Sequence, residues 1–263
     1  MKSFLLFAGL MFATFASHAA VQGREVSYSA NGTILKGYIA WDDAIKGKRP
    51  GILVVHEWWG NNEYTHQRAR MLAEYGYTAL ALDMYGDGKH THHPDDAGKF
   101  AGEVRNNAAL AKARFEAALG LIKNEPTVDA NNIAAIGYCF GGSVALNMAR
   151  AGEPLKAVLS YHGSLSTDHP AEAGKVQARI ASFSGEDDPV IPAAQVAAFR
   201  EEMSKAGVNY KALTYPGAKH AYTNPEADKY GKEFNLPMAY NAAADKASWD
   251  AGMAFLDEVF KQK

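Results

Sequence analysis

The sequence predicts an α/β fold with a mostly parallel central sheet, helices on both of its faces and a β-hairpin at the amino-terminal end. Two observations support this prediction. Short apolar runs such as residues 51–55 alternate with stretches of helical apolar spacing, a pattern typical of parallel strands that are covered on both sides. A second short apolar strand, 133–138, runs straight into a glycine-flanked turn and a helix of small residues.

Composition sets the outer limits. The chain has 263 residues, of which 48% are hydrophobic and 21% charged, and it contains no internal repeat or low-complexity linker. We therefore expect a single globular domain over residues 21–263, acting as a monomer. The formal net charge is only −2 and no basic run occurs, so the sequence gives no reason to expect a nucleic-acid partner.

Residues 1–20 have the pattern of a signal peptide. Lys2 precedes an apolar run over 4–13, and Ser17-His18-Ala19 provides small residues at a cleavage site. The run is shorter than the roughly 20 apolar residues that span a bilayer. We expect cleavage after Ala19 or Ala20, no membrane association afterwards, and a periplasmic or secreted protein.

The elements are then expected in the following order. Asn31-Gly32 supplies the turn of a hairpin over 24–40. Later strands are expected at 51–55, 78–82, 133–138, 157–161, 178–183 and 210–215, and helices around 63–75, over 98–123, after 139, at 193–206 and at about 239–261. Residues 124–132 and the Gly- and Asn-rich stretch after 215 are expected to be loops.

The turn at 137–141 reads G-x-C-x-G, with Cys139 where a nucleophile elbow places its serine. Such a turn strains the central residue, and small neighbours let strand and helix pass closely. Cys139 would lie at a helix N-terminus, which favours a thiolate. The alternative is a buried cysteine in an ordinary crossover. It is the single cysteine of the chain, so it cannot form an internal disulfide.

Two later strand ends carry the partners that a cysteine nucleophile needs. The strand ending near 183 leads into Asp187 and Asp188, and the strand ending at 215 leads to His220. Carboxyl ends of parallel strands meet at one edge of a sheet. The order nucleophile, acid, histidine is that of the α/β-hydrolase triad.

Five segments together resemble the dienelactone hydrolase family, the cysteine-nucleophile members of the α/β-hydrolase fold. They are H-E-W-W-G at 56–60, D-M-Y-G at 83–86, G-Y-C-F-G-G at 137–142, G-E-D-D-P at 185–189 and K-H-A-Y at 219–222. The resemblance covers nearly all of the chain after residue 20. It implies an α/β-hydrolase fold and a carboxylic ester hydrolase of the carboxymethylenebutenolidase type, which needs no cofactor.

The resemblance also assigns roles. His220 would exchange protons with Cys139 and the leaving group, and Asp188 would orient the imidazole, with Asp187 as the alternative acid. Glu57 matches a family glutamate that holds the resting thiol away from the histidine and keeps it poorly reactive. The alternative for Glu57 is a cap or dipole partner of the following helix.

The oxyanion hole is expected to consist of the backbone N–H groups of Phe140 and Trp58. Around the mouth, Trp58, Trp59, Tyr85 and Tyr222 are expected to contact substrate and to favour apolar or aromatic groups.

The chain departs from the family at the two arginines that clamp a substrate carboxylate, because Asp87 and Asn224 occupy those positions. We therefore expect neutral esters or lactones to be preferred over anionic ones, unless Lys89 or Lys219 supplies a replacement cation.

Further histidines raise other possibilities. His90, His92 and His93 lie beside several acids, but they lack the spacing of known zinc motifs, so we expect a solvated rim or lid and no metal site. His56 and His162 fall near strand ends, where a hydrogen-bonded structural role is favoured over substrate contact.

The sequence thus predicts an exported hydrolase of small-molecule esters or lactones that acts through a cysteinyl thioester. The alternative is a ligand-binding protein that keeps the α/β-hydrolase scaffold without turnover. Thiol redox chemistry ranks last, because no second cysteine is present to resolve a disulfide.

Overall fold

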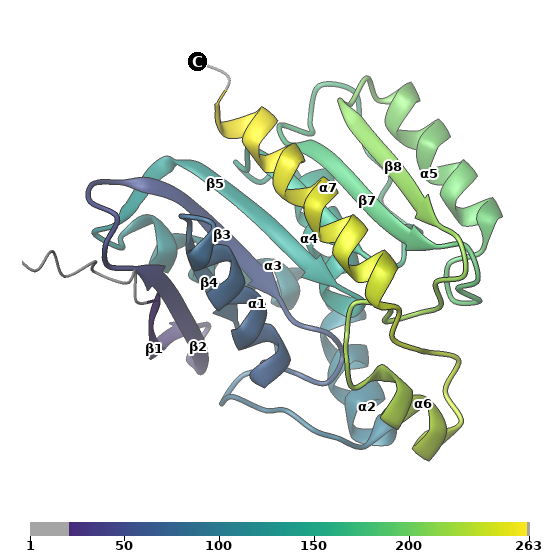
Figure 1. The fold of residues 1–263 in the computed structure, drawn as a ribbon. Coiled ribbons are helices and arrows are strands. Elements are labelled where there is room, and N and C mark those ends of the chain that lie inside the picture. Colours follow the sequence, from purple (N-terminus) through teal and green to yellow (C-terminus); the bar gives the residue numbers. More distant parts are fainter. Residues whose placement is uncertain (1–20, 262–263) are drawn as a thin grey trace, which may run out of the picture.

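An eight-stranded sheet forms the centre of the computed structural model, which describes residues 21–261 (Figure 1). Its spatial order is β1-β2-β4-β3-β5-β6-β7-β8. The strands are β1 Val21–Ala30, β2 Thr33–Asp42, β3 Arg49–Val55, β4 Thr78–Leu82, β5 Val128–Tyr138, β6 Ala157–Tyr161, β7 Arg179–Gly185 and β8 Tyr210–Tyr215. The helices are α1 Glu63–Glu74, α2 Pro94–Arg105, α3 Ala108–Lys123, α4 Phe140–Arg150, α5 Ala193–Lys205, α6 Ala227–Phe234 and α7 Ala242–Phe260.

The sheet is parallel from β4 to β8 and antiparallel at its amino-terminal edge. The β1–β2 hairpin turns at Asn31 and Gly32, which have φ values of 49° and 80°, and β2 pairs antiparallel with β4. The predicted hairpin and mostly parallel sheet are therefore confirmed. Parallel pairing places the carboxyl ends of β3 to β8 at one edge, where the candidate site lies.

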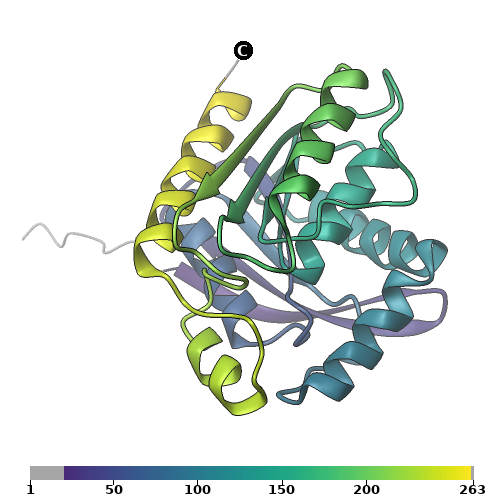
Figure 2. The same cartoon turned by 90° about the vertical axis from the view of Figure 1, so that its right-hand side faces the viewer.

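Helices cover both faces of the sheet. Leu53 and Val55 face one apolar core with residues of α2, α3, α4 and α5, while Ile52 and Val54 face a second core with residues of α1 and α7. Figure 2 shows α7 on one side of the sheet and the helices of the first core on the other. This alternation is why the strands read as continuous apolar runs in the sequence.

Three expectations about the elements are corrected. The helix expected over 98–123 is two helices, because Asn107 accepts a hydrogen bond from the Leu110 N–H at 3.0 Å and caps a new helix there. Strand β5 begins at Val128, inside the expected loop, with a register shift that leaves residues 130–132 unpaired with β3. The stretch expected as loop contains α6, whose eight polar-rich residues gave no long apolar period.

The proposed signal peptide lies outside the described residues. Within residues 21–261, no helix combines the length and the apolar character that a membrane crossing requires.

Candidate active site

Cys139 lies at the end of β5, immediately before α4, and is partly exposed. Its φ of 51° and ψ of −115° are strained for a residue with a side chain. The turn is tight: a Cβ on Gly137 would lie 2.0 Å from the carbonyl oxygen of Gly141. Glycine is therefore required here for the helix to start against the strand end, which presents the Cys139 side chain at the edge of the sheet.

His220 connects this thiol to a carboxylate. Its Nε2 atom lies 3.1 Å from Cys139 Sγ, and its Nδ1 atom lies 2.8 Å from Asp188 Oδ2. Asp188 is buried, and its second oxygen accepts a hydrogen bond from the Val190 N–H at 2.8 Å. Asp187, the alternative acid, is exposed. The structure thus brings Cys139, His220 and Asp188 into one hydrogen-bonded chain and leaves Asp187 outside it.

The loops that carry Asp188 and His220 are fixed to each other. The Asp187 N–H donates to the Ala218 carbonyl at 3.0 Å, and Gly185 passes so close that an added Cβ would lie 2.1 Å from that oxygen. Burial by itself lowers the pKa of His220, but the facing Cys139 sulfur and Asp188 together raise it well above the ordinary value. Both partners of the ring therefore stabilise a proton on His220.

Glu57 follows β3 and is fully buried next to this group. Its Oε2 atom accepts a hydrogen bond from Asn224 Nδ2 at 2.6 Å, and within the described structure its Oε1 atom has no hydrogen-bond partner. Burial raises the pKa of Glu57 to about 7, against smaller opposing effects of Asn224 and His220.

Two expectations about Glu57 change accordingly. The thiol contacts His220 in this structure, so Glu57 does not hold it away from the imidazole. Glu57 also does not cap α1, because the cap is Asn62, whose side chain accepts from the Thr65 N–H. The partner that the sequence did not reveal is Asn224, which is buried with Glu57 rather than exposed at a mouth.

The two residues predicted for the oxyanion hole come from adjoining segments. Phe140 is the first residue of α4, and the next residue, Gly141, packs so tightly on the end of β3 that an added Cβ would lie 2.3 Å from the Val55 carbonyl oxygen. The loop that follows β3 carries Trp58, whose carbonyl accepts a hydrogen bond from the Tyr85 hydroxyl at 2.9 Å. The two backbone N–H groups that are expected to bind an oxyanion therefore belong to segments that pack against each other.

The predicted aromatic mouth is corrected. Trp59, Tyr85 and Tyr222 are at most 3% exposed, and only Trp58 of the four is partly exposed. Trp59 stacks on Tyr230 with ring centroids 4.5 Å apart, and Tyr222 packs among core residues beneath the site. The Tyr85 and Tyr222 hydroxyls donate to the Trp58 and Phe183 carbonyls, so these rings can be buried with their polar ends satisfied.

The remaining histidines have local structural partners. His56 is buried and bridges two loops, with Nδ1 at 2.5 Å from the Glu57 carbonyl and Nε2 accepting from the Met84 N–H at 3.2 Å. Burial lowers its pKa to about 4, so it is neutral. His93 caps α2, and His92 contacts the Tyr230 hydroxyl at 2.8 Å. Among residues 21–261, no group of three or more His, Cys, Asp or Glu side chains is placed to hold a metal ion.

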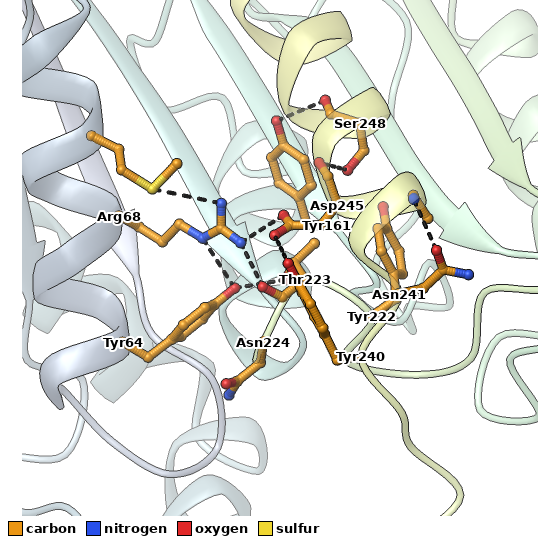
Figure 3. A network of polar contacts seen from close by, with 12 residues as sticks. Tyr64, Arg68, Tyr161, Tyr222, Thr223, Asn224, Tyr240, Asn241, Asp245 and Ser248 are labelled. Atoms are coloured by element: carbon orange, nitrogen blue, oxygen red, sulfur yellow. Dashed lines mark hydrogen bonds and ion pairs between the residues drawn. The ribbon is translucent and has the colours of Figure 1, made fainter. Parts of the chain in front are cut away.

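A buried polar network, which sequence reasoning missed, lies behind the site between α1 and α7 (Figure 3). Arg68 donates to the Thr223 carbonyl at 2.5 Å and to Asp245 Oδ1 at 2.7 Å, and Tyr64 lies 2.6 Å from Thr223 Oγ1. One signal was available: Arg68 lies between Tyr64 and Leu72 at spacings of four, on the apolar stripe of its helix. A charge on such a stripe indicates a buried partner.

A cavity of about 960 Å³ adjoins the elbow without including the catalytic candidates. It lies between α2, α3, α4 and the loop at 166–175, and Phe140 and Ser143 line the end nearest the elbow. Cys139, Asp188 and His220 do not line it, so the chemistry of the site rests on the hydrogen-bonded chain and not on this cavity.

The comparisons with known proteins agree with the fold. Residues 35–260 match the model of the dienelactone hydrolase family. Protein usf of Aquifex pyrophilus is 26% identical over 90% of this chain and 98% of its own, and a protein of Aquifex aeolicus provisionally named carboxymethylenebutenolidase is 28% identical over 78% and 89%. The crystal structure of a dienelactone hydrolase-like promiscuous phosphotriesterase from metagenomic libraries superposes with a TM-score of 0.85, at 33% identity over 91% of this chain and 99% of that one.

Proposed function

The chain belongs to the dienelactone hydrolase family of α/β-hydrolases, and from this premise we propose that it hydrolyses carboxylic esters or lactones through a Cys139-His220-Asp188 triad. The observation that carries the proposal is the continuous chain from Cys139 Sγ through His220 to Asp188, with contacts of 3.1 and 2.8 Å. Nucleophile, base and orienting acid are thus within hydrogen-bond reach of one another.

The first half of the reaction forms a thioester. Cys139 Sγ attacks the carbonyl carbon of the substrate while His220 Nε2 takes the thiol proton, and the Phe140 and Trp58 N–H groups stabilise the oxyanion. When the tetrahedral intermediate collapses, His220 gives this proton to the departing alcohol oxygen. Asp188 accepts the Nδ1–H bond throughout and stabilises the imidazolium.

The second half releases the acid. A water molecule gives a proton to His220 Nε2 as its oxygen attacks the thioester carbon. The C–S bond then breaks, the carboxylic acid leaves, and the proton returns to the Cys139 sulfur. For a lactone the alcohol remains attached to the acid, so a single hydroxy acid is released.

A screen of small esters and lactones tests the proposal by comparing the wild type with Cys139→Ala. We expect turnover in the wild type only, and an acyl-enzyme whose mass increase maps to Cys139 when a slow ester is used. Tight binding of an intact ester without turnover in either protein would instead support a binding protein on this scaffold.

Hydrolysis of neutral phosphotriesters is a second candidate, favoured by the similarity to the promiscuous phosphotriesterase. The same thiol and imidazole could attack phosphorus and protonate the leaving alcohol. Including an aryl phosphotriester in the screen tests this candidate. If Cys139→Ala and the wild type release its phenol equally slowly, this second activity is absent.

We also propose that the enzyme is exported after removal of residues 1–20, on the strength of their short charged and apolar segments. Amino-terminal sequencing of the mature protein from the cell envelope or medium is expected to begin at Ala20 or Val21. A mature protein that retains Met1 and stays in the cytoplasm would contradict export.

A further inference from the structure

We propose that His162 is a positioning residue, which fixes the nucleophile elbow relative to the loop that carries His220 by acting as a neutral imidazole protonated on Nε2. This inference rests on the proposed function, since it concerns the geometry of the Cys139–His220 pair. A chain of contacts behind the reacting atoms carries it.

The first contact joins His162 to the nucleophile. The Cys139 backbone N–H is shared between the Tyr161 carbonyl at 2.9 Å and His162 Nδ1 at 3.1 Å. A backbone N–H can only donate, so Nδ1 must accept with its lone pair. A neutral ring that accepts at Nδ1 carries its proton on Nε2, and the tautomer is thereby fixed.

The second contact joins His162 to the loop of the catalytic histidine. His162 Nε2 lies 2.7 Å from Thr223 Oγ1, and Thr223 is three residues beyond His220. Because Nε2 carries the proton, it donates to Thr223, whose hydroxyl also exchanges a hydrogen bond of 2.6 Å with the Tyr64 hydroxyl. One imidazole therefore connects the residue that attacks to the segment that carries its base.

Thr223 is itself anchored by the network of Figure 3. Arg68 donates to the Thr223 carbonyl at 2.5 Å and to Asp245 on α7 at 2.7 Å, and its Nε atom reaches the Tyr64 hydroxyl at 3.3 Å. Arg68 and Tyr64 both belong to α1. The His220 loop is consequently held from two helices on the same face of the sheet.

The strained backbone at Cys139 and His162 needs such supporting contacts. Cys139 and His162 end neighbouring parallel strands, and both have positive φ, 51° and 40°. Such conformations persist only when surrounding contacts over-determine them. The His162 backbone N–H also donates to the Phe183 carbonyl on β7 at 2.8 Å. The backbone that carries the imidazole is therefore itself held in place.

The charge state also favours the proton transfer. The His162 and His220 rings lie edge to face with centroids 5.4 Å apart. Burial, together with the nearby His220 and Arg68, lowers the pKa of His162 well below its ordinary value. The other titratable groups that face it are the buried rings of Tyr138 and Tyr222, while Tyr64 reaches it only through Thr223. A neutral His162 does not repel the imidazolium that His220 must become.

The test uses Thr223→Val in the full mature chain. Valine keeps the shape but cannot accept from Nε2–H. With a small aryl ester we expect kcat to fall about 10- to 100-fold, as for a small misplacement of catalytic groups, and KM to change less than about threefold. Thr223→Ser, which keeps the hydroxyl, is expected to restore kcat to within about threefold of the wild type.

Thr78→Val is the matched control. Thr78 is as buried as Thr223 and lies at the opposite edge of the sheet, where it begins β4. Thr78→Val loses one hydroxyl contact, to Thr127 Oγ1 at 2.8 Å, whereas Thr223→Val loses the contacts to His162 and Tyr64. We expect a comparable fall in Tm with wild-type kcat. If Thr223→Val matches this control in both Tm and kcat, the Thr223 contact is merely structural and the proposal is wrong.

A second measurement does not depend on turnover. The rate at which iodoacetamide alkylates Cys139, followed against pH, reports the pairing of its thiolate with the His220 imidazolium. Thr223→Val is expected to move the low-pH limb of this profile towards that of a free thiol, and Thr78→Val to leave it in place. An unchanged profile in Thr223→Val would overturn the proposal. A wild type that hydrolyses nothing would refute the proposed function while leaving this comparison decisive.

Should Thr223→Val not fold, His162→Asn tests the same link. The asparagine oxygen replaces Nδ1 as acceptor for the Cys139 N–H, but the side chain is too short to reach Thr223. The same loss of kcat and the same shift of the alkylation profile are expected, and wild-type behaviour would contradict the proposal.

Discussion

His162 and His220 are two buried imidazoles whose centroids lie 5.4 Å apart, yet their partners differ in kind. His220 meets a carboxylate at Nδ1 and a thiol sulfur at Nε2. His162 meets a backbone N–H at Nδ1 and a hydroxyl at Nε2. One ring faces two groups that can be anionic, and the other faces two neutral ones.

The pKa values of the two rings are consequently shifted in opposite directions. Burial lowers the pKa of both, but the Cys139 sulfur and Asp188 reverse the effect at His220 and raise its pKa well above the ordinary value. Charged neighbours, and not depth in the protein, therefore separate a candidate acid–base catalyst from a positioning residue.

The largest effect is expected when the reacting pair is removed. Cys139→Ala and His220→Ala should each lower kcat for esters by at least ~10⁴-fold, and the double variant should be little worse than either, because residues that act as one unit are strongly non-additive. Initial rates with a chromogenic ester measure this. Independent, multiplicative losses would show that the two do not form a unit. Cys139→Ser need not restore activity, since an alcohol is harder to deprotonate.

The second-largest effect is expected when the Asp188 carboxylate, which has no counterpart beside His162, is neutralised. Asp188→Asn leaves His220 with a neutral partner, as His162 has, and is expected to lower kcat by about 10²- to 10⁴-fold. Asp187→Asn is the matched control, because the side chain is exposed in the same loop, and it should stay within about twofold. If Asp187→Asn produced the larger loss, the acid would be misassigned.

Glu57 extends the comparison to a carboxyl whose pKa is raised by burial, against the smaller lowering effects of His220 and Arg68. Its folded pKa of about 7 lies above the unfolded value near 4.5, so the folded state binds the extra proton and stability falls as pH rises between these values. Glu57→Gln removes this loss. Above pH 7 the variant should gain up to ~3 kcal/mol over the wild type, and near pH 4 almost nothing.

Urea unfolding at pH 5 and pH 8 measures this gain, with the exposed Glu74→Gln as control. The control should show the same difference from the wild type at both pH values. A Glu57→Gln variant that is less stable than the wild type at pH 8 would mean that Glu57 is ionised and compensated in the folded protein.

The smallest effect concerns substrate charge. Asp87 is exposed and Asn224 is committed to Glu57, so neither offers a cation to a substrate carboxylate. We expect kcat/KM for a neutral methyl ester to exceed that for the carboxylate-bearing lactone by about 3- to 10-fold. Preference for the anion would contradict this. If such a preference were found and then lost in Lys89→Ala or Lys219→Ala, that lysine would be the cation that binds the carboxylate. Both are candidates, because Lys89 lies 4.0 Å from Asp87 and Lys219 is exposed.

Much of the fold could be predicted because its signals are local. The hairpin at Asn31-Gly32 and the strands that read as apolar runs are confirmed, since turn chemistry and burial on both faces leave marks in neighbouring residues. The break at Asn107 and helix α6 were missed, because a cap interrupts no apolar period and the apolar face of an eight-residue helix is too short to form a recognisable one.

The sequence by itself determined which residues reach the edge of the sheet that carries the candidate site. Cys139, Asp188 and His220 each follow a strand, and parallel pairing brings the ends of those strands together whatever the intervening loops do. Only the tertiary structure decided that Tyr222 lies in the core, that Asn224 binds Glu57 and that His162 joins Cys139 to Thr223. These contacts join segments far apart in the chain, and hydrogen-bond direction, burial and protonation depend on atoms that no local pattern encodes.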